Sequence, residues 1–401
     1  MKQDIRIADI RKCRHNNDLS FLVFSDDWGE HPSSCQHIFK QITKKHPVLW
    51  VNTIGTRNPK LNIYDLKKAL IKIKKMLFMR RTKNTHNDNN PTVIQPIMLP
   101  FFSLPGIKSF NKYSLQKAVS NSMKKNAINN PIMVITAPNA HEYIGSFGEK
   151  CSVYYCVDDY SEWPGLNQEE VVKMESALIQ KCNIFFATSD LLYNKISKTN
   201  KKVKLLTHGV DLEFYSKKNL PTHELLKDIP RPQVGYFGLF DDRSDKELIK
   251  SLSLKMPDIS FIITGSIDTD IRDLRSISNI HFTGSVPYKE LPQIISSWDI
   301  CMLPYRINEL TNAIQPLKIK EYLASGKPII STPIKEVKAL EKYVHLAETP
   351  DHWRKTIQKI LRTGPDDKAL NRNDFLKPES WERKADYFLE ICTEFVSRHD
   401  L

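Results

Sequence analysis

A chain of 401 residues is too long for one ordinary hydrophobic core and long enough for two domains of about 150 to 200 residues each. Hydrophobic residues make up 40% of the chain and charged residues 26%, which is typical of a soluble globular protein. No stretch reaches the roughly 20 apolar residues of a membrane span, and residues 1–18 lack the apolar core of a signal peptide. We therefore expect a cytoplasmic protein.

The net charge of +13 is unevenly distributed along the chain. Residues 1–220 carry 33 basic and 19 acidic side chains, whereas residues 221–401 carry 26 and 27. A nucleic-acid binder would be basic throughout, so we expect no nucleic acid partner and predict that one half meets another anionic partner. The seven cysteines are scattered without a C-x-x-C pair, which predicts reduced, mostly buried thiols.

Short apolar runs that end in Gly, Ser, Thr, Pro or Asp alternate with amphipathic stretches along the chain. Such runs are typical of buried parallel strands, and helix patterns such as Gln168–Lys181 and Tyr288–Ser297 separate them. The pattern predicts an α/β protein of two doubly wound, Rossmann-like domains. The predicted strands lie within residues 19–25, 47–52, 131–138, 152–159, 183–189, 203–209, 232–238, 259–265, 279–284, 299–305 and 327–332.

The strand series breaks at residues 216–232, which contain three prolines and no strand pattern. We therefore predict an N-terminal domain at 1–215, a linker at 216–232 and a C-terminal domain at 233–375. The last segment, 376–401, is predicted to be a helix that packs back on the N-terminal domain.

Residues 66–110 are predicted to be a basic insertion in the first domain. Leu66–Arg81 contains seven Lys and Arg residues and no acid, with apolar residues at helical spacing, so we predict a basic amphipathic helix. Farther on, Phe101, Phe102 and Leu104 lie between prolines, which we expect to forbid a regular element. Two interpretations stay open: a solvated basic face beside a core loop, or contact with an anionic membrane surface.

Glycines end three strands of the second domain, at Gly238, Gly265 and Gly284. Ligands bind at the carboxyl ends of strands in doubly wound sheets, so we expect these ends, with Ser285 and Val286, to form a nucleotide-sized crevice. Glycine would let the backbone approach a phosphate. Arg243, in the turn after Gly238, is placed to neutralise that phosphate, although a structural role for Gly238 is the alternative.

The segment "PLKIKEYLASG" predicts a short helix over Pro316–Ser325, because Pro favours the first helical position and Gly326 the stop. The amides of Leu317 and Lys318, together with the lysine side chain, predict an anion site suited to a diphosphate. Glu321 lies one turn farther, where a carboxylate can accept two hydrogen bonds from a vicinal diol such as ribose. The alternative for Glu321 is a surface residue paired with a lysine.

Two long segments together resemble a known enzyme family: "NIHFTGSVPYKELPQIISSWDICMLPY…PLKIKEYLASGKPIIST" and "SVYYCVDDYSEWPG…MESALIQKCNIFFATSDLLYNKI…VKLLTHGVD". They are similar to the retaining, metal-independent glycosyltransferases of the GT-B fold, in the family four group. Within that group the resemblance is to bacterial enzymes of cell-surface polysaccharide assembly, including the teichuronic-acid type, over residues of about 130–335.

The resemblance implies two Rossmann-like domains that face each other across a cleft. It also implies a hexosyltransferase that moves a sugar from a nucleoside-diphosphate donor, UDP- or GDP-linked, with retention and without a metal or other cofactor. The implied acceptor is a glycan or lipid-linked glycan at the inner face of the plasma membrane. The basic pattern of Leu66–Arg81 predicts that the protein reaches this surface as a peripheral protein. The rivals are a same-fold transferase with a small soluble acceptor and an inactive sugar-nucleotide-binding scaffold.

Glu321 resembles the second glutamate of the family's Glu-x7-Glu motif, which holds the donor ribose. The first glutamate would stand at Ala313 and is absent, so we expect Asn312, Gln315 or Glu309 to contact the transferred sugar in its place. The resemblance also implies that Leu317 and Lys318 form the backbone diphosphate clamp and that Arg243 lies near the donor phosphates, so that Lys318 and Arg243 would stabilise the leaving diphosphate. The strand-end and helix-start patterns add Gly238, Gly265, Gly284, Ser285, Val286 and Pro316 to the predicted donor site.

The loops after the strands of the first domain are implied to bind the acceptor. His141 resembles a family histidine near the reacting sugar and is the third predicted catalytic residue; a structural histidine is the alternative. The other acceptor candidates are Asp26, Asp27, Trp28, His31, Asn139, Asp158 and Asp159, with helix capping as the alternative for the last two.

Two further motifs are predicted to be structural. Asp268–Asp270 has the spacing of a metal-binding pair of acids, but it begins a helix pattern, in which Asp is an ordinary N-cap. His208–Asp211 stands where the family has its interdomain hinge, and we expect it to be structural or to lie at the mouth of the cleft.

Overall fold

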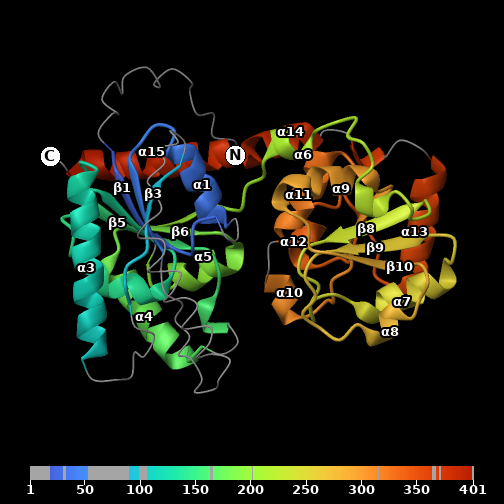
Figure 1. Cartoon of the computed structure of the whole chain (residues 1–401), viewed down its shortest axis with the longest axis horizontal. Coiled ribbons are helices and arrows are strands. Elements are labelled where there is room, and N and C mark those ends of the chain that lie inside the picture. The colour runs from blue at the N-terminus through green and yellow to red at the C-terminus, as the bar shows by residue number, and fades with distance from the viewer. Residues whose placement is uncertain are drawn as a thin grey trace. The chain divides into compact units, whose positions relative to one another are not determined.

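The computed structural model describes residues 19–29, 33–52, 90–98, 106–162, 166–200, 202–313, 316–363, 367–369 and 372–399. The chain forms two compact units, which we call unit 1 (Met1–Leu206 with Ala385–Leu401) and unit 2 (Thr207–Lys384) (Figure 1). The predicted basic helix Leu66–Arg81 and the apolar residues Phe101, Phe102 and Leu104 lie outside the described residues.

Unit 1 contains a parallel sheet of seven described strands in the order β3-β2-β1-β4-β5-β6-β7. The strands are β1 (Phe21–Ser25), β2 (Val48–Asn52), β3 (Thr92–Ile94), β4 (Ile132–Ile135), β5 (Cys151–Cys156), β6 (Ile184–Ala187) and β7 (Val203–Leu205). The helices are α1 (Ser34–Ile42), α3 (Ile107–Lys125), η2 (Pro138–Tyr143), η3 (Tyr160–Glu162), α4 (Gln168–Lys181), α5 (Asp190–Ser197) and, from Ala385 on, α15 (Trp381–His399).

Unit 2 contains a parallel sheet of six described strands in the order β10-β9-β8-β11-β12-β13. The strands are β8 (Gln233–Phe237), β9 (Ser260–Thr264), β10 (Ile280–Gly284), β11 (Ile300–Leu303), β12 (Ile329–Ser331) and β13 (His345–Leu346). The helices are α6 (Leu212–Tyr215), η4 (Glu224–Leu226), α7 (Lys246–Lys255), α8 (Arg272–Arg275), η5 (Tyr288–Glu290), α9 (Leu291–Ser297), α10 (Glu309–Ala313), α11 (Leu317–Ser325), α12 (Lys335–Lys338), α13 (Pro350–Thr363), η6 (Asp367–Ala369), α14 (Arg372–Leu376) and η7 (Lys377–Glu379).

Both strand orders are doubly wound, which confirms the predicted fold class, and helices lie on both faces of each sheet (Figure 1). In unit 1 the winding reverses between β1 and β4, and in unit 2 between β8 and β11. Loops at such a reversal diverge and leave room for a ligand outside the carboxyl ends of the strands. These two positions therefore locate the candidate site residues in each unit.

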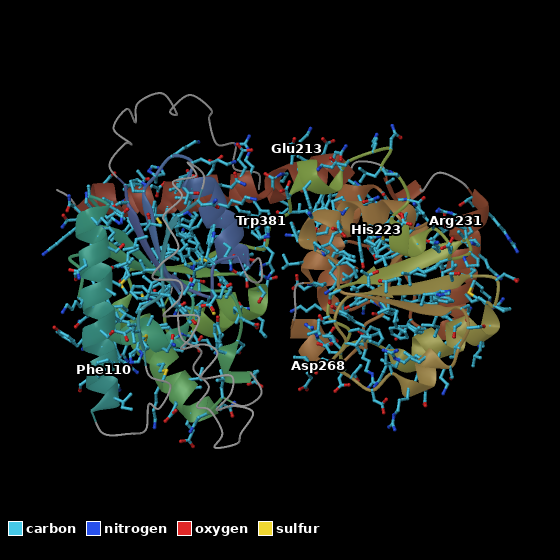
Figure 2. The ribbon with its side chains drawn as sticks, viewed as in Figure 1. Phe110, Glu213, His223, Arg231, Asp268 and Trp381 are labelled. Carbon is cyan, nitrogen blue, oxygen red and sulfur yellow. The ribbon has the colours of Figure 1, made fainter. Side chains whose placement is uncertain are left out.

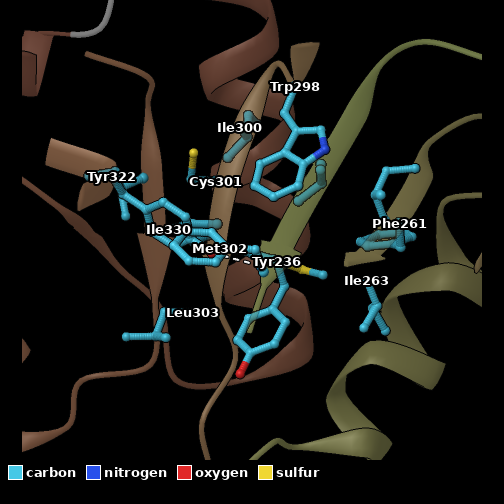
Figure 3. Packing of buried hydrophobic residues seen from close by; sticks show 14 of the residues in the cluster. Tyr236, Phe261, Ile263, Trp298, Ile300, Cys301, Met302, Leu303, Tyr322 and Ile330 are labelled. Carbon is cyan, nitrogen blue, oxygen red and sulfur yellow. Dashed lines mark hydrogen bonds between the residues drawn. The ribbon is translucent and has the colours of Figure 1, made fainter. Parts of the chain in front are cut away.

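The core of each unit is built from the fully buried strands. In unit 2, Gly235 lies beneath the indole of Trp298, and a Cβ on this glycine would come within 2.0 Å of the ring. Figure 3 shows Trp298 and Tyr322 among the aliphatic side chains of this core. In unit 1 the buried Phe388 of α15 stacks on Phe186 with ring centroids 4.9 Å apart, so this helix completes the core of unit 1.

All eleven predicted strands are present, and β3 and β13 are additional. The stretch around Phe101, Phe102 and Leu104, where prolines are predicted to forbid a regular element, lies outside the described residues, and regular elements lie on both sides of it. β3 forms between Pro91 and Pro96 at the edge of the sheet, where a strand needs few ladder hydrogen bonds, and α3 begins at Ile107 after the last proline.

The division between the units falls earlier in the chain than the predicted linker at 216–232. Tyr215 and Leu226, before and within that segment, are buried in the core of unit 2. The prolines of this segment interrupt the strand pattern, but the segment still packs on the core of unit 2. The six described cysteines are free and buried, as predicted, and none of the described helices is long and apolar enough to span a membrane.

Candidate functional site

The turns after β8 and β11 meet where the winding of the unit 2 sheet reverses. The Asp245 amide donates to the Pro304 carbonyl (2.7 Å), and the Arg306 amide donates to the Arg243 carbonyl (2.8 Å). These backbone bonds hold the two turns together, and they place Tyr305, the first residue after "MLP", beside the end of β8.

The three predicted glycine strand ends lie next to one another. The Gly238 amide donates to the Thr264 carbonyl at the end of β9, and the Gly265 amide donates to the Gly284 carbonyl at the end of β10, both at 2.8 Å. A Cβ on Gly265 would lie 2.1 Å from the Gly238 carbonyl oxygen, so the backbones approach as only glycine allows. The hydroxyls of Ser266 and Ser285 are 3.0 Å apart, and the half-buried Val286 packs on the core of unit 2.

Lys318 reaches from α11 to the end of β8. A Cβ on Gly238 would lie 2.2 Å from the Lys318 Cε, so the lysine side chain occupies the space that this glycine leaves. The Lys318 ammonium donates to the Tyr305 hydroxyl (3.4 Å) and lies 5.5 Å from the centre of the Tyr236 ring. Burial would raise the pKa of Tyr305, but Lys318 and Arg243 outweigh it and lower this pKa. The surroundings of the Tyr305 hydroxyl therefore stabilise a negatively charged group at this position.

Arg243, predicted to neutralise a phosphate, is already paired. Its guanidinium contacts the carboxylate of Asp241 through Nε at 2.9 Å and through Nη2 at 2.6 Å. Burial opposes both charges, yet the pair holds the pKa of Arg243 above and that of Asp241 below their ordinary values. Lys318 thus carries positive charge that Asp241 does not already neutralise.

The predicted helix over Pro316–Ser325 forms as α11, which begins one residue later. Pro316 has an extended conformation (φ −73°, ψ 113°) and is the N-cap residue, without a side-chain capping bond. Gly326 ends the helix in the left-handed conformation at φ 75°. Leu317 and Lys318 therefore form the first turn of the helix, as predicted.

Glu321 lies one turn beyond Lys318 on the same helix and is half-buried. Its carboxylate accepts a hydrogen bond of 2.8 Å from the hydroxyl of Tyr215. Burial raises the pKa of Glu321, and the contributions of Tyr215 and Lys318 offset this only in part. The alternative of an exposed residue paired with a lysine is not what the structure shows.

The three residues predicted to replace the missing first glutamate have different surroundings. The Asn312 side-chain oxygen accepts from the amide of Lys335 at 3.0 Å, so this oxygen already holds the start of α12. Glu309 is exposed at the beginning of α10. Gln315 and the side chain of Ala313 lie outside the described residues.

The first predicted acceptor loop follows β1 in unit 1, at the reversal of the winding. Asp26 accepts from the side chains of Ser25 (2.6 Å), Ser33 (3.0 Å) and Gln36 (2.6 Å), which bind the loop to the start of α1. Asp27 is half-exposed, and the half-buried Trp28 packs edge-on against Trp50 with centroids 4.7 Å apart. His31 lies outside the described residues.

The second predicted acceptor loop follows β4 and forms the 3-10 helix η2. His141 Nδ1 is 3.0 Å from the Pro138 carbonyl oxygen, a local contact that orients the ring. Both His141 and Asn139 are half-exposed. Strands β1 and β4 are neighbours in the sheet. The two predicted acceptor loops, which follow these strands, therefore lie at the same edge of the sheet.

Asp159 is part of an ion-pair cluster within unit 1. Lys195 lies 2.8 Å from Asp159 and 2.8 Å from the buried Glu175, and the Ser161 amide donates to Asp159 at 3.2 Å. Burial would raise the pKa of Asp159, but Lys195 and Ser161 lower it. Asp158 accepts from the Asp159 amide at 2.8 Å. These contacts favour the capping alternative for the pair.

The segment His208–Asp211 is tied into a second buried cluster, which the sequence did not predict. The Lys320 ammonium donates to the His208 carbonyl and lies 2.5 Å from Glu379, which Lys384 also contacts at 3.0 Å. Asp211 accepts from the amide of Phe214 and caps α6. These contacts support the structural interpretation of the segment.

The aspartates of Asp268–Asp270 do not converge. Asp270 pairs with Arg272 at 2.6 Å and accepts from the Arg272 amide at 3.0 Å, close to the predicted capping role although the N-cap position falls on Ile271. In the described part of the chain, no three His, Cys, Asp or Glu side chains form a group that could hold a metal ion.

Three comparisons with known proteins show what this chain is similar to. Residues 232–363 match the family "Glycosyl transferases group 1". A Bacillus subtilis (strain 168) protein named as a teichuronic acid biosynthesis glycosyltransferase, TuaH, is 27% identical over 230 residues. That alignment spans 53% of this chain and 58% of the relative.

Solved structures are similar over nearly the whole chain. Anabaena Alr3699/HepE in complex with UDP and glucose superimposes with a TM-score of 0.62 at 11% identity, covering 94% of this chain and 99% of that one. Sucrose-phosphate synthase from Thermosynechococcus elongatus superimposes with a TM-score of 0.66 at 14% identity, covering 95% and 100%. Residues 232–363 therefore resemble the group 1 glycosyltransferases, in a chain that has the GT-B fold of two Rossmann-like units.

Proposed function

We propose that this protein transfers a sugar from a nucleoside diphosphate to an acceptor, with retention of configuration. One observation carries the proposal: Lys318 and Glu321 lie one turn apart on α11, with the lysine seated against Gly238 at the end of β8. A diphosphate at the start of α11 would meet the first-turn amides and the Lys318 ammonium. Both interactions strengthen as negative charge develops on the leaving group.

The donor in this proposal is UDP- or GDP-linked. Glu321 would accept hydrogen bonds from the two ribose hydroxyls, with Tyr215 holding the other side of the carboxylate. The complex of Anabaena HepE with UDP and glucose supports a nucleotide-sugar donor, because that protein has the same fold. Metal independence belongs to the proposal and rests on the resemblance to the family four group.

The acceptor is proposed to be a lipid-linked glycan or a nascent surface polysaccharide at the inner face of the plasma membrane. The name of the Bacillus relative supports a role in the synthesis of a surface polymer. The basic segment Leu66–Arg81 would hold the protein at anionic lipid. Flotation with phosphatidylglycerol vesicles tests this part: a variant with Lys67, Lys68, Lys72, Lys74 and Lys75 changed to Ser should float less than wild type, and equal flotation contradicts it.

The rival function is a sugar-nucleotide-binding scaffold without turnover. Two observations favour it: Ala313 stands where the family has its first glutamate, and Arg243 is already paired with Asp241. A panel of UDP-, GDP- and dTDP-sugars separates the two functions. Bound donors should raise the melting temperature by mass action in both cases, whereas only the enzyme hydrolyses or transfers the sugar.

The residue assignment is tested with Lys318→Met, compared with Lys338→Met, and with Glu321→Gln, compared with Glu382→Gln. Lys338 on α12 and Glu382 on α15 are exposed, so each control changes the charge by the same amount as its site variant on a surface with no assigned role. We expect both site variants to lose turnover by at least about tenfold, since each removes a charged contact. Wild-type turnover in Lys318→Met would contradict the assignment, and no turnover of any donor by wild type would favour the scaffold.

A further inference from the structure

Unit 1 contains an open cavity of about 430 Å³ whose lining is strongly basic. It lies between the first turns of α3, the 3-10 helix η2 and the last residue of α4. The lining side chains are Lys108, Ser109, Lys112, His141, Glu142 and Lys181.

The charges that line the cavity do not cancel. Lys108 contacts Glu142 at 2.5 Å, which neutralises one lysine. Lys112 and Lys181 add two further positive charges, and Ser109 and His141 add polar groups that bind oxygen atoms. The cavity therefore carries a net charge of about +2 with neutral histidine, which suits an anion with several oxygen atoms.

The helix dipole adds to this positive charge. α3 has 19 residues, its N-cap residue Gly106 makes no side-chain capping bond, and its first turn contains no acid. Lys108 and Ser109 in that first turn line the cavity, so the positive end of a long helix lies at its wall. Nothing in the first turn offsets that charge.

An exposed aromatic stripe lies beside the cavity on the same helix. Phe110, labelled in Figure 2, is 46% exposed, and Tyr113 is 62% exposed. The Lys117 ammonium lies 5.6 Å from the centre of the Tyr113 ring. Helical spacing places Phe110, Tyr113 and Lys117 on one stripe. Tyr113 lies four residues after Ser109, so this stripe borders the cavity on the Ser109 side, away from Lys108 and Lys112. An anionic group in the cavity would thus have an apolar surface beside it.

We propose that this cavity binds a phosphate or diphosphate group of the acceptor. The inference rests on the proposed function, because it assigns the group to the acceptor. A diphosphate has the charge and the acceptor oxygens that Lys108, Lys112 and Lys181 would bind. The aromatic stripe favours a polyprenyl chain attached to that group over a free phosphate ion.

The test measures binding of three probes by calorimetry: inorganic pyrophosphate, farnesyl diphosphate and farnesol. The protein carries Lys318→Met throughout, so that the lysine of the candidate donor site cannot bind the probes. The cavity variant is Lys112→Ser with Lys181→Ser. The matched control is Lys124→Ser with Lys125→Ser, which removes the same charge from the last turn of α3.

We expect the cavity variant to bind pyrophosphate and farnesyl diphosphate at least about tenfold more weakly, and the control to change by less than about twofold. Tighter binding of farnesyl diphosphate than of pyrophosphate identifies a lipid-linked group, and equal binding identifies a soluble phosphate. Equal losses in both variants, or binding of farnesol as tight as that of farnesyl diphosphate, would overturn the proposal.

Measurements of donor binding and sugar transfer distinguish failure of this inference from failure of the proposed function. With Lys318 restored, the cavity variant should bind UDP-glucose as tightly as the control variant does. A protein that binds diphosphate in the cavity but transfers no sugar would retain this inference and lose the proposed function. A protein that transfers sugar with the same KM for the acceptor in both variants would lose this inference alone.

Discussion

Gly238 and Lys318 share one small volume at the end of β8. The glycine has φ +113°, and a Cβ there would lie 2.2 Å from the Lys318 Cε and 2.7 Å from its Nζ. The Tyr236 ring and the Tyr305 hydroxyl lie on other sides of the ammonium. The position of the cation is therefore set by the absence of a side chain 80 residues earlier in the chain.

Replacing Gly238 by Ala should displace Lys318 and weaken donor binding. The methyl group would overlap the lysine side chain, and the positive φ adds backbone strain of about 1 kcal/mol or more. We expect a rise in the donor dissociation constant of about tenfold, because a charged contact is lost. Gly145→Ala is the control: its φ is +83° but a Cβ would meet nothing within 4 Å. Similar donor affinities in the two variants would show that Lys318 does not bind the donor.

Replacing Tyr215 by Phe should weaken donor binding without unfolding unit 2. The change removes the hydrogen bond to Glu321 but keeps the ring that packs edge-on against Phe214 at 5.0 Å. We expect a loss of about 0.5–1.5 kcal/mol, or roughly two- to tenfold in the donor dissociation constant. Titration calorimetry measures the constant, and a thermal melt checks the fold. An unchanged constant would mean that Glu321 needs no orienting partner.

Because the pKa of Glu321 is raised, donor affinity should begin to fall at a higher pH than it would with an ordinary carboxyl group. Protonation turns one oxygen of the carboxyl group into a donor and removes its charge, so the hydrogen bonds from the ribose hydroxyls weaken. Donor binding therefore weakens as pH falls through the folded-state pKa, which burial raises above 4.5. The folded state also keeps a proton that the unfolded state releases, so this group lowers stability as pH rises through the same range. Glu321→Gln should bind more weakly and abolish this pH dependence. A wild-type limb at the ordinary carboxyl value would contradict the assignment.

The main features of the fold followed from the sequence because each buried parallel strand is a compact apolar run with a turn residue at its end. β3 and β13 were missed because they have only three and two residues and lie at sheet edges, where no apolar run is needed. The unit boundary was displaced because prolines mark a break in the strand pattern, while Leu226, which follows the first of them, is still buried in unit 2.

The site was predictable where a glycine or proline marks the end of a helix or strand, as at Gly238 and in α11. The contacts of its tyrosines were not predictable. Tyr215 meets Glu321 across 106 residues, and neither its spacing nor its neighbours in the sequence indicate that contact. Tyr305 could have been noticed, because it directly follows the strand and turn "ICMLP" at the switch point. Asp159 was assigned to the acceptor because the sequence does not show its pairing with Lys195.

Asp159→Asn should change stability more than acceptor binding. The variant leaves Lys195 with Glu175 alone, in surroundings where Lys195 has a raised pKa because the two carboxylates outweigh its burial. We expect a loss of about 1–3 kcal/mol in the free energy of unfolding and an unchanged KM for the acceptor. The exposed Glu390→Gln, in the interior of α15, is the charge-matched control. A large rise in KM with unchanged stability would restore Asp159 to the acceptor site.

Glu379→Gln should be among the most destabilising single changes in unit 2. Glu379 lies between Lys320 and Lys384, and the Lys320 side chain is only 6% exposed. The amide removes the carboxylate that both ammonium groups contact, and breaking a buried ion pair costs about 3–5 kcal/mol. Urea denaturation measures this cost, with the exposed Glu382→Gln as the control, expected within about 0.5 kcal/mol of wild type.

The pH dependence of protein stability tests the role of Glu379 independently. Burial would raise the pKa of Glu379, but Lys320 and Lys384 lower it below 4.5. The stability that this carboxylate contributes is therefore complete above its unfolded-state pKa and is lost as pH falls through the folded-state value. Glu379→Gln should flatten the acid side of the stability curve, whereas Glu382→Gln should not. If both variants follow the wild-type curve in acid, the two lysines are solvated in the folded protein, and the segment His208–Asp211 is held by its backbone hydrogen bonds to Glu379 and Trp381 alone.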